Sequence, residues 1–447
     1  MILPSLLGCA ANPATGKMQL NVVDEQTELR MGAEMDAQIA ASMPMVEDEG
    51  LQAWVSGVVQ RLAATSERPD LPWTVRVLDD EALNAFAVPG GHLYVTRGLL
   101  CWLHSEDELA AVLGHEVAHV TARHSATAMS RAVLGSPFGA LVHAVDPNQR
   151  HVGAVVGVGA GLFGLKHSRA DEREADELSL RYLERAGYDP AAMLDVLAVL
   201  EATEDAAGRL PTWLSTHPPP EDRLERLGAV ASTGERDTAS LVAHLDGLVF
   251  GADPRRGTLI GDRFVVPEAA LGIDLPAGWK HEQRDGQLVS VAPDGMASLQ
   301  VGDVQDQDPE QALAALMEGL QPGEAREDGL RGFRLEGMGR DGAMHALDGL
   351  ATAVVAGDRV WMAVGAGDEG SWDDVRSALE VSLTSLGPEE DPAVLGVRPQ
   401  RLRMVELPGP TALATFAEEH PGAPATTLAL LNRADEQLPA GVVRFVE

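Results

Sequence analysis

The sequence predicts an α+β protein with a mainly helical amino-terminal half containing a small sheet. A separate α+β domain and a small strand–helix–helix–strand module follow this half. Apolar residues recur at helical spacing in several segments between residues 26 and 228. Residues 263–387 instead carry short runs of alternating polarity, which are typical of half-buried strands. The length of 447 residues allows two or three domains, each with its own core.

Changes in composition along the chain set the expected domain boundaries. The Asp253–Gly257 turn lies in a segment that has the character of a linker. We expect a leader and linker at 1–25, a mainly helical domain at 26–232, a linker at 233–262, an α+β accessory domain at 263–387 and the small module at 398–447.

Composition excludes two classes of function. The chain has 68 acidic and 34 basic residues, so its net charge is −34. This charge argues against nucleic acid and against electrostatic binding to anionic lipid. No apolar run reaches the roughly 18 residues that a membrane span needs. The longest candidate, Val152–Leu165, is short and rich in glycine.

The most informative stretch is His115-Glu116-Val117-Ala118-His119, an H-E-x-x-H pentapeptide. Ser105 and Glu108 predict a capping box that starts a helix ahead of it. The two histidines then lie on one helix face, where both imidazoles can bind one metal ion. Glu116 lies beside them and is suited to take a proton from a metal-bound water. A surface helix with solvated side chains is the alternative, and the apolar context disfavours it.

A catalytic zinc needs a third protein ligand and an open position. In one known layout, a third histidine follows six residues after the second. Ser125 occupies that position here, and His124 is one residue out of register. In the other layout, a glutamate comes from a later helix, and the acidic run Ser168–Asp176 supplies one.

This later helix is expected to begin at Ser168 and to end near Gly187. Glu172 and Asp176 share one of its faces, whereas Glu174 points elsewhere. We therefore predict that Glu172 is the third ligand. Asp176 is predicted to accept the N–H of a ligand histidine and so fix its tautomer.

With His115, His119 and Glu172-x-x-x-Asp176, the chain resembles the gluzincin zinc metallopeptidases. This family includes the CAAX prenyl endopeptidases, HtpX and the periplasmic beta-barrel assembly-enhancing protease. The resemblance covers about residues 20–230 and implies a zincin-type fold for the 26–232 domain, with one Zn²⁺ per chain. Its further matching segments are Leu83–Val95, Gly187–Pro190 and Thr216–Pro219.

The resemblance also implies roles for residues outside the ligand set. Asn84 and Ala85 would contact the substrate backbone. His217 has two candidate roles: a hydrogen bond to the developing oxyanion, or a fourth zinc ligand that displaces the water. We expect the second role in the resting state.

These features predict a zinc-dependent endopeptidase that uses metal-activated water to cut peptide bonds. Its expected substrates are misfolded or misassembled cell-envelope proteins. One alternative is a chaperone-like assembly factor with a latent protease, because the carboxy-terminal half carries no catalytic motif. Another is a purely structural zinc, since four closed protein ligands mark such sites.

The Leu6-Leu7-Gly8-Cys9 stretch resembles a lipobox, although the apolar run before it is short. It predicts lipidation of Cys9 and a bacterial periplasmic location, and Ala10 favours the outer membrane. Cys101 lies in an apolar run and is expected to be a buried free thiol. Residues 398–447 weakly resemble a LysM module, which predicts peptidoglycan as a further partner. The glycine-rich segment Gly135–Lys166 is predicted to form a flap over the cleft.

Overall fold

The α+β class is confirmed, and the chain forms two compact units. One unit holds residues up to Gly251 together with Gln400–Glu447, and the other holds Ala252–Pro399. The predicted flap, beyond Gly135, lies outside the described residues. The computed structural model describes residues 9–135, 167–207, 211–218, 223–232, 236–284, 287–304, 308–318, 320–323, 329–338 and 344–447.

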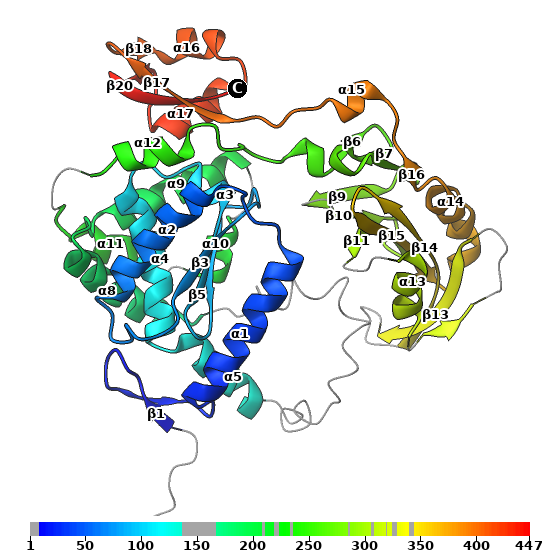
Figure 1. Ribbon diagram of the computed structural model, residues 1–447, viewed down its shortest axis with the longest axis horizontal. Helices are drawn as coiled ribbons and strands as arrows, with labels where there is room; N and C mark the ends of the chain where they lie inside the picture. The colour runs from blue at the N-terminus through cyan, green and yellow to red at the C-terminus, as the bar shows by residue number, and fades with distance from the viewer. Residues whose placement is uncertain are drawn as a thin grey trace, which may run out of the picture. The chain divides into compact units, whose positions relative to one another are not determined.

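Helix α4 (Glu106–Thr121) lies at the centre of the first unit, and every one of its residues is buried. Its sequence is apolar on most sides, as expected for a helix surrounded by protein. Helices α2, α8 and α9 and strand β4 all contact it (Figure 1). The other helices of this half are α1 (Glu25–Ser42), α2 (Glu49–Ala63), α3 (Arg97–Leu100), α5 (His124–Gly135), α8 (Arg169–Ala186), α9 (Ala192–Ala207), α10 (Thr212–Thr216), α11 (Arg223–Gly228) and α12 (Ala239–Leu245).

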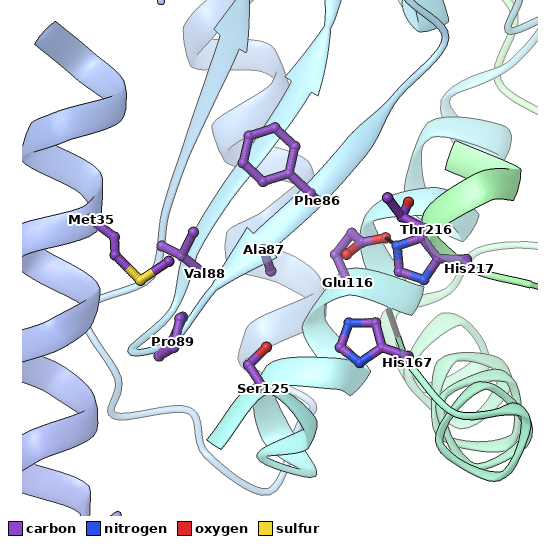
Figure 2. A pocket seen from close by; sticks show the side chains of 10 residues that line it. All are labelled: Met35, Phe86, Ala87, Val88, Pro89, Glu116, Ser125, His167, Thr216 and His217. Carbon is purple, nitrogen blue, oxygen red and sulfur yellow. Dashed lines mark ion pairs between the residues drawn. The ribbon is translucent and has the colours of Figure 1, made fainter. Parts of the chain in front are cut away.

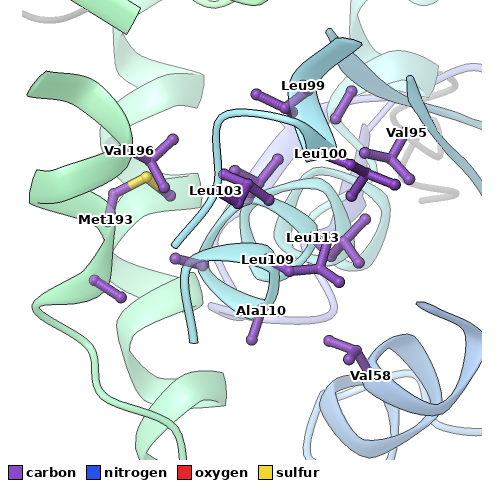
Figure 3. Close-up of a cluster of buried hydrophobic side chains, with 14 of the residues drawn as sticks. Val58, Val95, Leu99, Leu100, Leu103, Leu109, Ala110, Leu113, Met193 and Val196 are labelled. Carbon is purple, nitrogen blue, oxygen red and sulfur yellow. The ribbon is translucent and has the colours of Figure 1, made fainter. Parts of the chain in front are cut away.

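Figure 3 shows how aliphatic side chains surround the start of α4. Leu109 and Leu113 of α4 belong to one core cluster with Val58 of α2 and Val196 of α9. All four side chains are fully buried. Burial of each such side chain contributes about 1.5–3 kcal/mol, so this core fixes the helix that carries the H-E-x-x-H motif.

The helix starts differently from the predicted capping box. Ser105 Oγ accepts from Glu108 N at 3.2 Å, as expected. The reciprocal bond is not made, because Glu108 Oε2 accepts instead from His104 N at 2.9 Å. The Glu108 carboxylate also pairs with Arg433, 325 residues later in the chain. The Glu108 carboxylate therefore binds a neighbouring backbone N–H and a distant arginine instead of the N–H of Ser105.

A small sheet lies beside α4 in the order β3-β5-β4. Strand β3 (Thr74–Leu78) is parallel to β5 (His92–Thr96), and β4 (Ala85–Val88) is antiparallel to β5. Among the described residues, β4 is an edge strand. Asn84 O accepts from Thr96 N, and hydrogen-bonded pairs alternate along an antiparallel ladder. The backbone groups of Ala85 and Ala87 therefore face the free edge.

The carboxy-terminal segment shows the predicted strand–helix–helix–strand pattern, but it belongs to the first unit. Its apolar residues, including Leu428 and Phe416, join the same core cluster as α4. Arg444 is 5% exposed and donates to Cys101 O. Cys101 is a buried free thiol, as predicted. The elements of this segment are β17 (Leu402–Leu407), β18 (Thr411–Ala412), α16 (Leu413–Glu419), α17 (Ala425–Asn432), β19 (Gln437–Leu438) and β20 (Gly441–Val446).

Two short strands, β1 (Cys9–Ala11) and β2 (Met18–Leu20), form an antiparallel hairpin at the amino-terminal end of the described chain. Asn12 N donates to Lys17 O at 2.8 Å and closes this hairpin. Cys9 is the first residue of β1, and its side chain lies outside the described part of the chain. No helix in that described part has the length and apolarity that a bilayer crossing requires.

The second unit contains a seven-stranded antiparallel sheet and a four-stranded sheet. The alternating runs of residues 263–387 form strands, as predicted. The predicted linker 233–262 is partly ordered, since it contains α12 and the first strand of this unit. The larger sheet has the order β12 (Gln321–Pro322), β13 (Arg331–Met338), β14 (Met344–Ala356), β15 (Arg359–Asp368), β11 (Ala297–Val304), β10 (Gln287–Val291) and β9 (Lys280–Arg284).

The smaller sheet packs into a core with the larger one through residues such as Phe264, Ile273 and Trp361. The remaining elements of this unit are the smaller sheet β16 (Gly387–Pro388), β8 (Leu271–Asp274), β7 (Arg263–Val266) and β6 (Thr258–Ile260), the helices α13 (Pro309–Met317), α14 (Trp372–Thr384) and α15 (Pro392–Leu395), and the short 3-10 turns η1 (Pro254–Arg256) and η2 (Pro267–Ala269).

Substitution of Arg433 by Met should destabilise the first unit. The change leaves the Glu108 carboxylate, which is 1% exposed, without its bidentate partner. Arg433 is 28% exposed, so we expect a loss of about 2 kcal/mol, below the range for a fully buried pair. Urea unfolding measures this loss. Arg403→Met, which breaks a pair with the exposed Glu447, is the control and should change stability little. Equal stability of the two variants would show that the pair of Arg433 with Glu108 does not stabilise the first unit.

Candidate metal centre

His115 and His119 lie one turn apart on α4 and direct their Nε2 atoms to a common point. These two nitrogens are 3.0 Å apart, and both side chains are buried. Neutral imidazole nitrogens at this distance repel through their lone pairs unless a proton or a cation lies between them. The two imidazoles are therefore suited to bind one metal ion together.

Helix α8 brings Glu172 to the same point. Its N-cap Ser168 forms a capping box with Asp171, and Gly187 ends it in a left-handed conformation at φ 82°. Glu172 Oε2 is 3.2 Å from His115 Nε2, and Glu172 Oε1 is 3.4 Å from His119 Nε2. The close approach of α4 and α8 depends on Gly114, because a Cβ there would lie 3.1 Å from Ser179 Oγ.

His217 completes a group of four donors. It is the C-cap residue of α10, and its Nδ1 is 3.1 Å from Glu172 Oε1. One donor atom each from His115, His119, Glu172 and His217 all lie within 4.8 Å of one another, and all four residues are buried. The second ring nitrogen of His217, Nε2, is 3.5 Å from Glu116 Oε1.

The donor set fits zinc. Four ligands at 2.0–2.1 Å around a tetrahedral ion would be about 3.4 Å apart. Four separations in the cluster, 3.0, 3.1, 3.2 and 3.4 Å, are near that value when both oxygens of Glu172 are counted. With one donor atom per residue, all four atoms lie within 4.8 Å of one another. Imidazole nitrogen and carboxylate oxygen are both ligands that zinc accepts, so these side chains are close enough to share one ion.

The electrostatics of the cluster agree with this fit. Burial would raise the pKa of Glu172, but His217 and the hydrogen bond with His115 hold it well below its usual value. Burial opposes the charged form of His115, yet Asp176 and Glu172 raise its pKa to about 9. Without a metal, a proton on His115 therefore supplies positive charge to this site. Metal binding requires that proton to leave.

Asp176 lies behind His115, on the side away from the other donors. Its Oδ1 is 3.2 Å from His115 Nδ1 and accepts from Arg223 at 2.8 Å. Arg226 donates to the other oxygen at 3.3 Å. Burial raises and these partners lower the pKa of Asp176, and the lowering prevails. An ionised carboxylate here directs the Nε2 lone pair of His115 toward the metal position.

A pocket opens beside the donor cluster, and Figure 2 shows its lining. Glu116 and His217 face each other across a short gap, with His167 next to them. The pocket lies between these groups and strand β4 with the turn after it. Its lining residues are Met35, Phe86, Ala87, Val88, Pro89, Glu116, Ser125, His167, Thr216 and His217.

The predicted substrate contacts, Asn84 and Ala85, do not line this pocket. Both side chains are buried, and Ala85 belongs to the apolar core. The backbone groups of Ala85 point to the outer edge of β4, but the whole residue is 0% exposed there. Ala87, two residues on and facing the same edge, does line the pocket. The Asn84 carbonyl does not face this edge, because it is bonded to Thr96 N.

Sequence reasoning missed two aromatic residues of the site. Trp213 Nε1 donates to Glu116 Oε1 at 3.1 Å, and its ring stacks on His217 at 5.2 Å between centroids. His167 lies 4.0 Å from the ring of His119, and its Nδ1 is buried without a hydrogen-bond partner among the described residues. Burial and then His217 lower the pKa of His167 to about 3. Trp213 lies four residues before His217, which was the only available signal.

Two buried histidines and a buried glutamate on two helices, with a second glutamate beside them and an open pocket, define the gluzincin class of metal centre. Comparison with known proteins agrees, because residues 49–231 match the model of Peptidase family M48. This part of the chain is therefore similar to Peptidase family M48.

Several known proteins match a little under half of the chain. The putative beta-barrel assembly-enhancing protease of Vibrio cholerae is 31% identical over 47% of this chain and 46% of its own length. The beta-barrel assembly-enhancing protease of Escherichia coli is 31% identical over 44% of this chain and 42% of its own length. The mitochondrial metalloendopeptidase OMA1 of Schizosaccharomyces pombe is 32% identical over 48% of this chain and 64% of its length. The chain thus spans less than half the length of the two bacterial relatives.

Metal analysis tests the donor set directly. The purified protein should carry one equivalent of zinc, which a chelator removes. Glu172→Ala should lose this zinc, because the remaining imidazoles lack the charged ligand. Glu177→Ala, on the same helix with a side chain 67% exposed, is the matched control and should keep the zinc. Plasma emission spectrometry gives the zinc content of each variant. Full zinc in Glu172→Ala would contradict the assignment.

Proposed function

We propose that the protein is a zinc metalloendopeptidase with His115, His119 and Glu172 as the metal ligands and Glu116 as the general base. The observation that carries this proposal is a buried donor cluster that opens, past Glu116, into a pocket beside an edge strand. Zinc, when bound, lowers the pKa of a water ligand to about 7 and polarises the scissile carbonyl.

The chain's own residues perform the proton transfers. Glu116 takes a proton from the attacking water and passes it to the leaving amine. Trp213 holds Glu116 Oε1 through its indole N–H, so this carboxylate keeps one oxygen directed by the protein and one for the proton. This fixed position lowers the cost of ordering the base in the transition state.

The substrate backbone lies along the free edge of β4 in this proposal. Ala87 directs its N–H and C=O groups to that edge and lines the pocket, whereas Ala85 faces the same edge but is fully buried in this structure. An extended peptide would add as a further strand through these groups. Asn84, whose side chain is buried, is left out of this contact.

In the resting enzyme, His217 blocks the fourth ligand position of the zinc and so keeps the enzyme inactive. Its Nδ1 faces Glu172 at 3.1 Å and belongs to the donor group, so it occupies the position that water needs. The oxyanion role requires this ring to turn away from the donors. While His217 stays in its place at the end of α10, its ring would be the fourth zinc ligand and would close the site to water.

The natural substrates proposed are misfolded or misassembled proteins of the bacterial cell envelope. The names of the bacterial relatives support this class. We further propose that Cys9 carries a lipid that attaches the protein to the outer membrane on its periplasmic side. Peptidoglycan binding by the carboxy-terminal segment stays a prediction, since its described contacts are with helices of its own unit.

Glu116→Gln should retain zinc and lose cleavage. The amide cannot accept the proton of the attacking water, so casein hydrolysis should fall about 10²–10⁴-fold. Gel analysis of casein cleavage and zinc content are measured on the same preparation. Glu184→Gln, an exposed change on α8, should leave both unchanged. Full cleavage by Glu116→Gln would refute the proposed mechanism.

His217→Ala should raise the rate of casein cleavage, because removal of this imidazole frees the fourth ligand position for water. His281→Ala, in the second unit, controls for the general effect of losing an imidazole and should match the parent. The initial rate per bound zinc is the measured quantity. A lower rate in His217→Ala would instead assign His217 to the oxyanion.

A further inference from the structure

We propose that Asn12, Glu174 and His124 form a hydrogen-bonded chain that positions His119, so that the amino-terminal hairpin is part of the metal centre. The inference rests on the proposed zinc site. It assigns a role to Glu174, which helical spacing places away from the metal, and to His124 and Asn12, which lie outside the ligand motifs.

Three short contacts connect Asn12 to His119. Asn12 Nδ2 donates to Glu174 Oε2 at 2.8 Å. The same oxygen is 3.0 Å from His124 Nε2. His124 Nδ1 is 3.0 Å from His119 Nδ1. His124 is 1% exposed and Asn12 is 2% exposed, so water does not compete freely for these groups.

Metal binding fixes the direction of every bond in this chain. His119 presents Nε2 to the metal, so its proton must lie on Nδ1. His124 Nδ1 must then accept that N–H, which places the proton of His124 on Nε2. The Nε2–H in turn donates to Glu174, and the Asn12 amide donates to the same carboxylate. Each contact therefore pairs one hydrogen-bond donor with one acceptor.

The backbone between the two histidines supports a positioning role. Arg123 has φ 61°, a left-handed conformation that is costly for a residue with a side chain. Arg123 Nε donates to Glu28 at 2.6 Å, and its NH2 donates to Val23 O at 2.8 Å. These contacts hold the turn that ends α4 and brings His124 beside His119 at the start of α5.

The hairpin that carries Asn12 is fixed to the same region. Asn12 Oδ1 accepts from Ala14 N at 2.9 Å, which orients the amide so that Nδ2 faces Glu174. Gln19 of β2 donates to Ala122 O, at the end of α4, at 3.1 Å. The residues that follow Cys9 are thereby connected to a metal ligand by side-chain hydrogen bonds. His115 has the separate support of Asp176, so the two histidines are held independently.

Zinc affinity of the full chain, measured by competition with a chromophoric chelator, tests the proposal. His124→Phe and Glu174→Ala should each bind zinc about 10–100-fold more weakly. Asn12→Ala should weaken binding by a smaller factor. Glu174→Gln keeps an oxygen acceptor and should retain more affinity than Glu174→Ala. Glu184→Gln, exposed on the same helix, should match the parent.

The visible spectrum of the cobalt-substituted protein gives a second readout. His124→Phe should shift the absorption bands because His119 changes its orientation and basicity, an effect that a loss of stability alone does not produce. If His124→Phe does not fold, Glu174→Ala is decisive, since the Glu174 side chain is 20% exposed. If Glu174→Ala binds zinc as tightly as the parent and its cobalt spectrum is unshifted, the positioning role is wrong. Casein cleavage by the parent would still support the proposed function. Absence of zinc binding by the parent would overturn both.

Discussion

The architecture of the first unit depends on the burial of one carboxylate. Glu172 is fully buried with three imidazoles around it. An isolated ionised carboxylate in such a place would cost far more than the fold could supply. Only positive charge at the centre of the cluster offsets that cost, either as a proton on His115 or as a divalent cation. The apolar packing around α4 holds His115 and His119 beside this carboxylate.

A second layer of polar groups holds those side chains in place. Asp176 is held by Arg223, whose guanidinium also lies over the ring of Trp213 at 5.1 Å. Trp213 in turn directs Glu116. One arginine therefore connects the orientation of His115, a proposed ligand, with that of Glu116, the proposed general base. These directional contacts restrict the centre more tightly than apolar packing alone.

Both ends of the described chain contribute to this unit. The amino-terminal hairpin contacts the end of α4 through Gln19 and the ligand helix through Asn12. The carboxy-terminal segment contacts the start of α4 through Arg433 and Glu108. These two contacts place the central helix between segments that are far apart in sequence. The metal centre is therefore supported from both ends of the helix that carries it.

The sequence by itself determined the local patterns: the H-E-x-x-H helix, the capped helix with Glu172 and Asp176, and the alternating strands of the second unit. Spacing on one helix is a local property, so it can be read directly. Tertiary structure alone decided which side chains from separate elements meet. It paired Glu108 with Arg433, and it placed Trp213 and His167 in the site. It also directed Glu174 to His124. These contacts join residues up to 325 positions apart, and no periodicity encodes them.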